Sequence, residues 1–249
     1  MEMKFAFFEY CMIVSLILYG MSALLVCFRA PRPGSWLVMT GLGVNVIALV
    51  SIGYIGGEWY FFPMLDELRL IPAIIAIFAF AVMGRGERRE TMAIMGMLLL
   101  VTFIAVISQT DPPMPTIKSK SLFASLFFLS EAASVALFLM AGALAVSTLL
   151  VHSSIRKPWN GPVLWGFLIF TLCQILGSLW AFIGWSYPFS WSPRHLMSAS
   201  IWCFYGAAIH FCYIRMNTKL KALLIMIGII PVVFMVYHHQ IMELLGTKI

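Results

Sequence analysis

Long apolar runs, broken only by short charged or proline-rich segments, constrain this chain more than any other feature. They cover roughly 5–28, 36–56, 70–84, 91–109, 122–151, 162–184, 196–214 and 219–240. A helix of about 20 apolar residues crosses the hydrocarbon core of a bilayer, and only helices or closed barrels satisfy the backbone in lipid. Because the runs are continuous rather than alternating, they predict an all-α, polytopic membrane protein with about eight transmembrane helices.

The composition indicates that the lipid bilayer is the main solvent. The chain is 62% hydrophobic and 10% charged, whereas roughly 45–50% apolar is typical of soluble domains. We expect one integral membrane domain over residues 1–249, whose first run is a mature spanning helix because no small-residue cleavage site follows it. The five cysteines fall within apolar runs without a CxxC pair, so buried thiols are expected rather than redox chemistry. The basic isoelectric point is assigned to loop charge, and no nucleic-acid partner is expected.

Loop charge predicts the orientation in the membrane. The loops after the first, third, fifth and seventh runs carry ten of the 16 basic residues, namely Arg29, Arg32, Arg85, Arg88, Arg89, Arg156, Lys157, Arg215, Lys219 and Lys221. Most of the acidic residues lie in the other loops. The positive-inside rule then assigns the basic loops to the cytoplasm. Both termini, and the loop between the sixth and seventh runs, are expected on the outer side.

That outer loop, 177–195, is unusually rich in aromatic residues. Its sequence from residue 180 onward is WAFIGWSYPFSWSPRH, with Trp180, Trp185 and Trp191 in a short segment that two prolines stiffen. Aromatic rings collect at membrane interfaces in any case, and this explains single tryptophans elsewhere in the chain. Three in one loop predict a rigid surface for a flat apolar ring system, for which haem is the obvious biological candidate.

Haem iron needs ligands, which are normally histidines, and the chain has five. His210 lies within an apolar run, where an ionisable residue suggests a function, although a neutral ring bonded to a backbone carbonyl is an equal alternative. His195 ends the aromatic loop, and His238 and His239 lie near the outer end of the last run, so each could bind iron or be solvated. His152 is expected in a solvated cytoplasmic loop. The favoured metal ligand is His210.

Glu131 is the one acidic residue within a span-length run. A proton relay, a substrate contact and a position at the outer membrane boundary are all open, and we favour the boundary because the run 122–151 is overlong. Other chemistry has little support, since the chain has no phosphate-binding glycine loop, no HExxH zinc motif and no GxSxG nucleophile elbow. We expect no enzymatic activity of the chain by itself.

The segment LGSLWAFIGWSYPFSWSPRHLMSASIWCFYGAAIH resembles the tryptophan-rich signature of the cytochrome c assembly proteins, the CcsA/ResC type of haem handler. The matching residues fall in register without a gap: Gly177, Trp180, Ala181, Trp185, Trp191, Pro193, Trp202 and His210. The resemblance covers nearly the whole chain, because the segment around residues 45–57 and the helix that contains Gly142 also fit the family pattern.

The chain departs from the family at several functional positions. The family's aspartate after the tryptophans is Ser192 here, and one family tryptophan is Phe189. The first membrane histidine is Asn45, an amide that is a poor iron ligand, and the first outer histidine falls near Phe128. The second outer histidine falls beyond residue 249. Of the four ligand histidines that the resemblance implies, only His210 is in register.

The resemblance implies a haem-handling membrane protein of cytochrome c maturation. Such a protein binds haem, or presents it at the outward tryptophan segment to an apocytochrome c, with a separate membrane partner subunit. The missing histidines leave a second hypothesis open: a ligand-poor paralogue that acts as scaffold or regulatory subunit of a cytochrome-containing or haem-synthesis-related membrane complex. A small-molecule transporter is a weaker third, since no inverted repeat is visible. The expected location is a bacterial or archaeal cell membrane, or a thylakoid-type equivalent.

Overall fold

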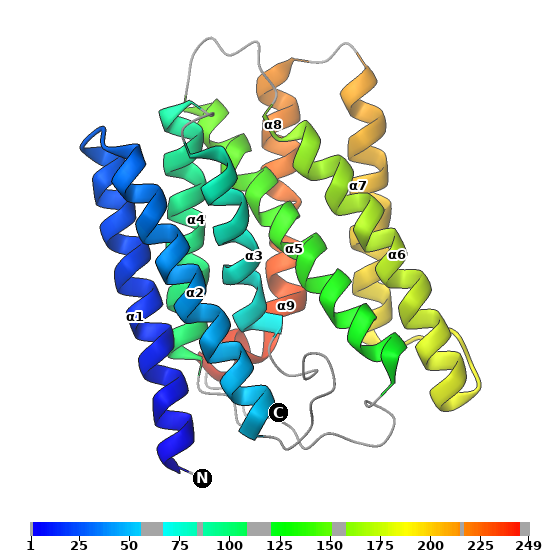
Figure 1. Cartoon of the computed structure of the whole chain (residues 1–249). Coiled ribbons are helices and arrows are strands. Elements are labelled where there is room, and N and C mark those ends of the chain that lie inside the picture. The colour runs from blue at the N-terminus through cyan, green and yellow to red at the C-terminus, as the bar shows by residue number, and fades with distance from the viewer. Residues whose placement is uncertain are drawn as a thin grey trace. The chain divides into compact units, whose positions relative to one another are not determined.

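A computed structural model describes residues 2–55, 67–83, 87–108, 121–150, 158–214 and 217–244. Within these ranges the chain is all-helical and contains no strand, which confirms the all-α prediction (Figure 1). The chain divides into two compact units, Met1–Thr116 and Ile117–Ile249. The assignment of 1–249 to a single membrane domain stays a prediction.

Six stretches of the described chain are long and apolar enough to cross a membrane: Phe7–Cys27, Pro31–Ser51, Arg88–Ile107, Leu122–Leu149, Asn160–Trp185 and Thr218–Tyr237. A seventh apolar helix, Leu68–Val82, is shorter. Many large apolar side chains on these helices are exposed, such as Ile17 and Leu24, as expected where lipid surrounds the protein. The helices therefore indicate an integral membrane protein, but the predicted count of about eight spans is not confirmed.

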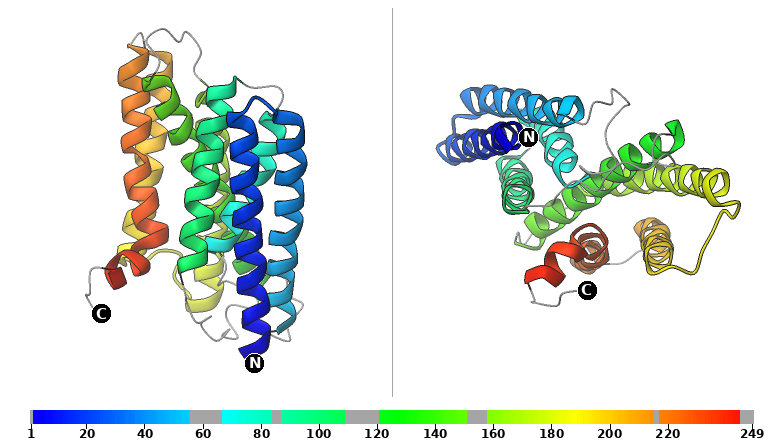
Figure 2. Two further views of the ribbon diagram at one scale, coloured as in Figure 1. Left: turned by 90° about the vertical axis from the view of Figure 1, so that its left-hand side faces the viewer. Right: turned by 90° about the horizontal axis from the view of Figure 1, so that it is seen from below.

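The first unit contains four described helices: α1 (Glu2–Cys27), α2 (Pro31–Ile55), α3 (Glu67–Val82) and α4 (Arg88–Ile107). Helix α1 packs against both α2 and α4, and α3 contacts α2 and α4 (Figure 2). A guanidinium nitrogen of Arg88 donates a hydrogen bond to the carbonyl of Cys27. The turn between α1 and α2 and the start of α4 therefore lie at the same end of this unit, as the loop charges predict.

The second unit is built around α5 (Leu122–Leu149), which contacts α6 (Asn160–Trp185), α8 (Thr218–Ile227) and α9 (Ile229–Leu244). Helix α7 (Pro193–Tyr213) packs against α6, α8 and α9. Small residues line the contacts of α5 with its neighbours. A Cβ on Gly142 would overlap Ile229 of α9, at 1.7 Å from its Cδ1 atom. Because glycine lets backbones approach closely, it is favoured at contacts between membrane helices.

The last predicted run, 219–240, is interrupted by a break between α8 and α9. Gly228 separates the two helices, and Pro231, three residues later, has no N–H to donate to the carbonyl of Ile227. A Cβ on Gly228 would lie 2.3 Å from the ring of Phe204 in α7. The break therefore combines a missing helical hydrogen bond with a close contact that only glycine permits.

Two glycines of α2 provide a matched test of helix packing in the first unit. A Cβ on Gly41 would lie 2.6 Å from the buried ring of Tyr19 in α1, whereas one on Gly43 meets nothing within 4 Å. We expect Gly41→Ala to destabilise the protein by about 1–3 kcal/mol through overpacking. Gly43→Ala should be neutral or slightly stabilising, because alanine is the better helix former. Thermal unfolding in detergent, followed by circular dichroism, measures both, and equal midpoints would contradict the α1–α2 packing.

Candidate functional site

The aromatic segment is a short turn between two helices. Helix α6 continues to Trp185 and ends because Ser186 adopts the left-handed conformation, with φ of 62°. Helix α7 begins at Pro193, and the side chain of Ser192 caps it by accepting a hydrogen bond from the backbone N–H of His195. Proline in the first turn and serine at the N-cap are both favoured. The connection is therefore only residues 186–192, and most of the predicted loop 177–195 is helical.

The cap at the start of α7 is uncharged. Ser192 fills the N-cap position, for which serine and aspartate are both strongly favoured. Serine therefore starts α7 without placing a negative charge in the turn.

Four aromatic rings at alternate positions give the turn an exposed surface, which we call the aromatic turn: Trp185, Tyr187, Phe189 and Trp191. Trp191 is 82% exposed, the highest value among these four. Its ring meets Phe189 edge to face, with centroids 5.4 Å apart. Exposed apolar surface of this extent marks contact with lipid, a ligand or another protein.

His195 lies beside the aromatic turn, at the start of α7. Its ring packs edge to face against Phe189 at 5.5 Å between centroids. Its Nδ1 lies 2.7 Å from the hydroxyl oxygen of Ser192 and 3.0 Å from that of Ser190. Partial burial, and then the neighbouring charge of Arg194, lower the pKa of His195 below its usual value of 6.5. The imidazole is therefore neutral at physiological pH, which is the form that binds metals.

Trp180 belongs to a separate, inner cluster with α5. Its ring lies 5.9 Å from Phe127, 5.7 Å from Phe128 and 5.4 Å from Trp185, measured between centroids. Gly177 allows this approach, because a Cβ there would lie 2.8 Å from the Phe127 ring. The three tryptophans predicted to bind haem therefore differ in their surroundings. Trp180 packs between α5 and α6, and Trp191 is exposed. Trp185 contacts Trp180 and also belongs to the aromatic turn.

The structure reveals an ion pair that the sequence does not indicate. Glu131 is completely buried within α5, and its Oε2 lies 2.6 Å from a guanidinium nitrogen of Arg194 in α7. The guanidinium also lies 6.0 Å from the centroids of Phe127 and Phe128. The favoured interpretation of Glu131 as a boundary residue is therefore incomplete, because its carboxylate holds the start of α7 against α5.

His210 lies at the other end of α7 from His195. Fifteen residues separate them, which is about 22 Å along a helix, so they cannot bind the same iron. The Nδ1 of His210 lies 2.7 Å from the carbonyl oxygen of Gly206. The alternative of a ring bonded to a backbone carbonyl is thus what the structure shows, although the second ring nitrogen remains a potential ligand.

The roles predicted for the other histidines stay predictions. His238 and His239 lie in α9, which returns toward the end of this unit where α6 and α7 join (Figure 1). Their side chains are outside the described residues, as is the whole of His152. Among the described residues, no three histidine, cysteine or acidic side chains lie close enough together to hold a metal ion.

A groove of about 680 Å³ lies between α6 and α7. Its walls are mainly apolar and include the rings of Phe189 and Trp202, with polar side chains from Thr171, Gln174 and Ser178. None of the predicted site residues belongs to the described lining, but Phe189 joins the groove to the aromatic turn. Sequence reasoning missed this groove, although the polar residues at helical spacing within an apolar run were a visible signal.

Comparison with known proteins does not identify this arrangement. No protein-family model matches the sequence, and no curated protein matches it significantly.

The ion pair makes a prediction about stability. Arg194→Met leaves the buried carboxylate of Glu131 without its counter-charge, so we expect a loss of about 2–3 kcal/mol, below the cost for a fully buried pair because Arg194 is half exposed. Adding Glu131→Gln removes the charge and should recover much of that loss. Thermal or urea unfolding of both single variants and the double variant measures the coupling. Additive effects would show that the pair contributes nothing.

Proposed function

We propose that this chain is a haem-handling integral membrane protein of the cytochrome c maturation type. On this proposal it binds haem, or presents it, at the aromatic turn, and a membrane partner subunit or an apocytochrome c docks there. The single observation that carries the proposal is the position of a neutral histidine, His195, against an exposed set of aromatic rings. The resemblance of the tryptophan segment to the family signature supports the same function.

The residues of the aromatic turn suit haem in several respects. Flat rings such as Trp191 and Phe189 offer stacking and edge contacts to a porphyrin. The hydroxyls of Ser190 and Ser192 hold the Nδ1 of His195, which leaves Nε2 as the nitrogen for iron. Bound haem would supply a redox-active iron and the porphyrin that cytochrome c maturation attaches to its target. The described residues offer no second histidine at this position, so any second ligand to the iron would come from elsewhere.

A second candidate function is favoured because the described residues supply only one histidine ligand at the aromatic turn. A ligand-poor relative of the family would keep the fold as a scaffold or regulatory subunit of a membrane complex, cytochrome-containing or related to haem synthesis. The exposed rings would then contact a protein partner, since tryptophan and tyrosine are enriched where interfaces derive most of their binding energy. Purification from native membranes in mild detergent distinguishes the two functions. A stoichiometric partner without haem supports the scaffold.

The haem proposal predicts a specific pattern among histidine variants. Protein purified after expression with added haem should show a Soret band. His195→Ala should reduce the haem content at least fivefold, whereas His210→Ala should have little effect, since His210 lies about 22 Å away along α7. Pyridine haemochrome assay gives the stoichiometry. Haem loss in His210→Ala with retention in His195→Ala would instead assign the iron ligand to the opposite end of the helix.

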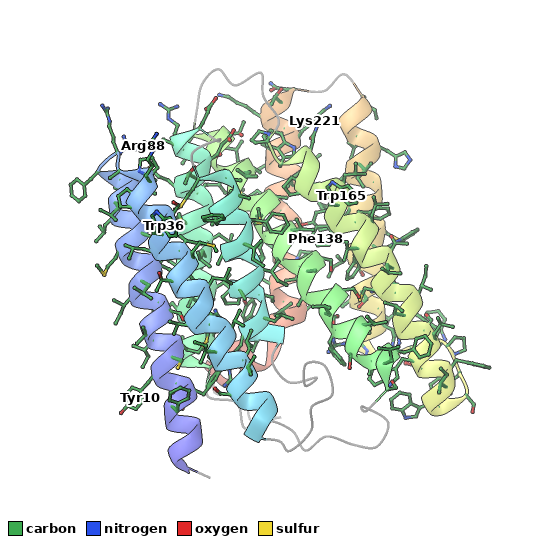
Figure 3. All side chains as sticks on the ribbon, in the orientation of Figure 1. Tyr10, Trp36, Arg88, Phe138, Trp165 and Lys221 are labelled. Atoms are coloured by element: carbon green, nitrogen blue, oxygen red, sulfur yellow. The ribbon has the colours of Figure 1, made fainter. Side chains whose placement is uncertain are left out.

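A matched pair of tryptophans tests the ring surface. Trp191→Ala should weaken haem binding, because it removes the most exposed ring of the aromatic turn. Trp165→Ala is the control, since Trp165 is also exposed, at 61%, but lies near the other end of α6 (Figure 3). Titration of haem into apoprotein, followed by absorbance, measures both affinities. Equal affinities, or no haem binding by the unaltered protein, would contradict the proposal.

A further inference from the structure

The turn between α1 and α2 carries an arginine where helix ends usually have glycine. Arg29 adopts the left-handed conformation, with φ of 63°. Its backbone N–H donates to the carbonyl of Val26 at 3.2 Å, and that of Ala30 donates to the carbonyl of Leu25 at 2.8 Å. This pair of hydrogen bonds is the Schellman motif, whose left-handed residue is most often glycine because a Cβ atom is unfavourable there. An arginine at this position costs stability, so its side chain calls for a functional explanation.

Three further arginines lie at the same end of the first unit. Arg32 is in the first turn of α2, and Arg88 and Arg89 begin α4. The hydrogen bond from the guanidinium of Arg88 to the carbonyl of Cys27 holds the start of α4 at the end of α1. These three residues and Arg29, which we call the arginine cluster, are all exposed. Like charges that share one end of a unit repel one another, so a bound anion would stabilise the cluster.

The fold itself neutralises little of this positive charge. Apart from Arg88, no member of the arginine cluster donates a side-chain hydrogen bond or forms an ion pair within the described part of the chain. The carboxylate of Glu90, in the first turn of α4, accepts a hydrogen bond from the backbone N–H of Glu87 at 3.4 Å. This carboxylate therefore serves the N-terminus of α4, where negative charge is favoured. The remaining guanidinium groups are available to an external anion.

The arginine cluster lies where three membrane-spanning stretches of this unit end. Phe7–Cys27 ends just before Arg29, and the stretches that start at Pro31 and Arg88 begin beside it. Residues at the end of a span lie at the level of the lipid headgroups. Two aromatic side chains at the same end are largely exposed, Phe28 at 79% and Trp36 at 75% (Figure 3). Aromatic rings favour the membrane interface, which supports this depth for the cluster.

We propose that the arginine cluster binds the phosphate group of an anionic phospholipid, such as phosphatidylglycerol. Guanidinium groups donate paired hydrogen bonds to phosphate oxygens, and an anionic headgroup brings no ammonium group to compete with them. The acyl chains lie along exposed apolar side chains of the same helices, such as Leu24 and Met39. The left-handed arginine is then explained, because its charge is needed at the turn itself. The lipid site does not depend on haem at the aromatic turn.

Native mass spectrometry of the full chain in detergent tests the proposal, because it counts the lipids that stay bound during a titration. Phosphatidylglycerol should bind more tightly than phosphatidylcholine with the same acyl chains. Arg29→Gly should weaken the binding of phosphatidylglycerol about fivefold, as for one basic residue near a membrane surface, and adding Arg32→Gln should weaken it further. Lys219→Gln is the matched control, since it removes one positive charge from the start of α8 in the second unit and should leave the affinity unchanged.

The same variant separates lipid binding from a structural role of Arg29. Glycine suits the left-handed conformation, so the thermal midpoint of Arg29→Gly in lipid-free detergent should rise by about 2–4 °C while its lipid affinity falls. A lower midpoint would show that the arginine supports the fold directly, and would overturn the proposal.

Three binding results would also overturn the proposal. These are equal affinity for the two lipids, unchanged affinity in Arg29→Gly, and an equal loss in Lys219→Gln, which would indicate a response to total charge. Full competition by inorganic phosphate, at the same concentration as the lipid, would assign the arginine cluster to a soluble anion instead. Haem binding should be the same in Arg29→Gly as in the unaltered protein, so failure of the lipid site leaves the function proposed for the aromatic turn untouched.

Discussion

The ion pair between Glu131 and Arg194 is the interaction on which the arrangement of the candidate site depends. A carboxylate buried within a membrane-spanning helix is tolerated only if a counter-charge reaches it, and Arg194 does so from the first turn of α7. The same residue lies next to His195 in sequence and helps to keep that ring neutral. A single guanidinium thus connects helix packing, the position of the aromatic turn and the protonation of its histidine.

Much of the fold could be predicted from the sequence, because the bilayer leaves few options for an apolar run. The described helices follow the predicted runs closely, and the break in the last one occurs next to the only residue pair, Gly228 and Pro231, that could cause it there. The number of spans is harder to predict from the sequence, because helix length and polarity vary continuously. Helices α3 and α7 are not among the six described stretches that are long and apolar enough to cross a membrane.

The site was predictable in composition but not in geometry. The sequence drew attention to the aromatic segment and to His195, both of which lie together at the start of α7. It favoured His210 because that residue interrupts an apolar run, yet the structure shows its ring bonded to the carbonyl of Gly206. The partnership of Glu131 with Arg194 had no local signal, since 63 residues separate the two. Contacts between distant helices depend on packing angles that no single-sequence pattern encodes.

The neutral cap at the start of α7 has a consequence for the depth of the aromatic turn. Residues 186–192 carry no charged side chain, because serine occupies the capping position, and the nearest cation is already compensated from within α5. Such a segment loses little hydration energy on entering the headgroup layer, and its indole and phenol rings favour that layer. The turn can therefore partition into the membrane surface. A hydrophobic, planar molecule would reach it there by lateral diffusion within the leaflet.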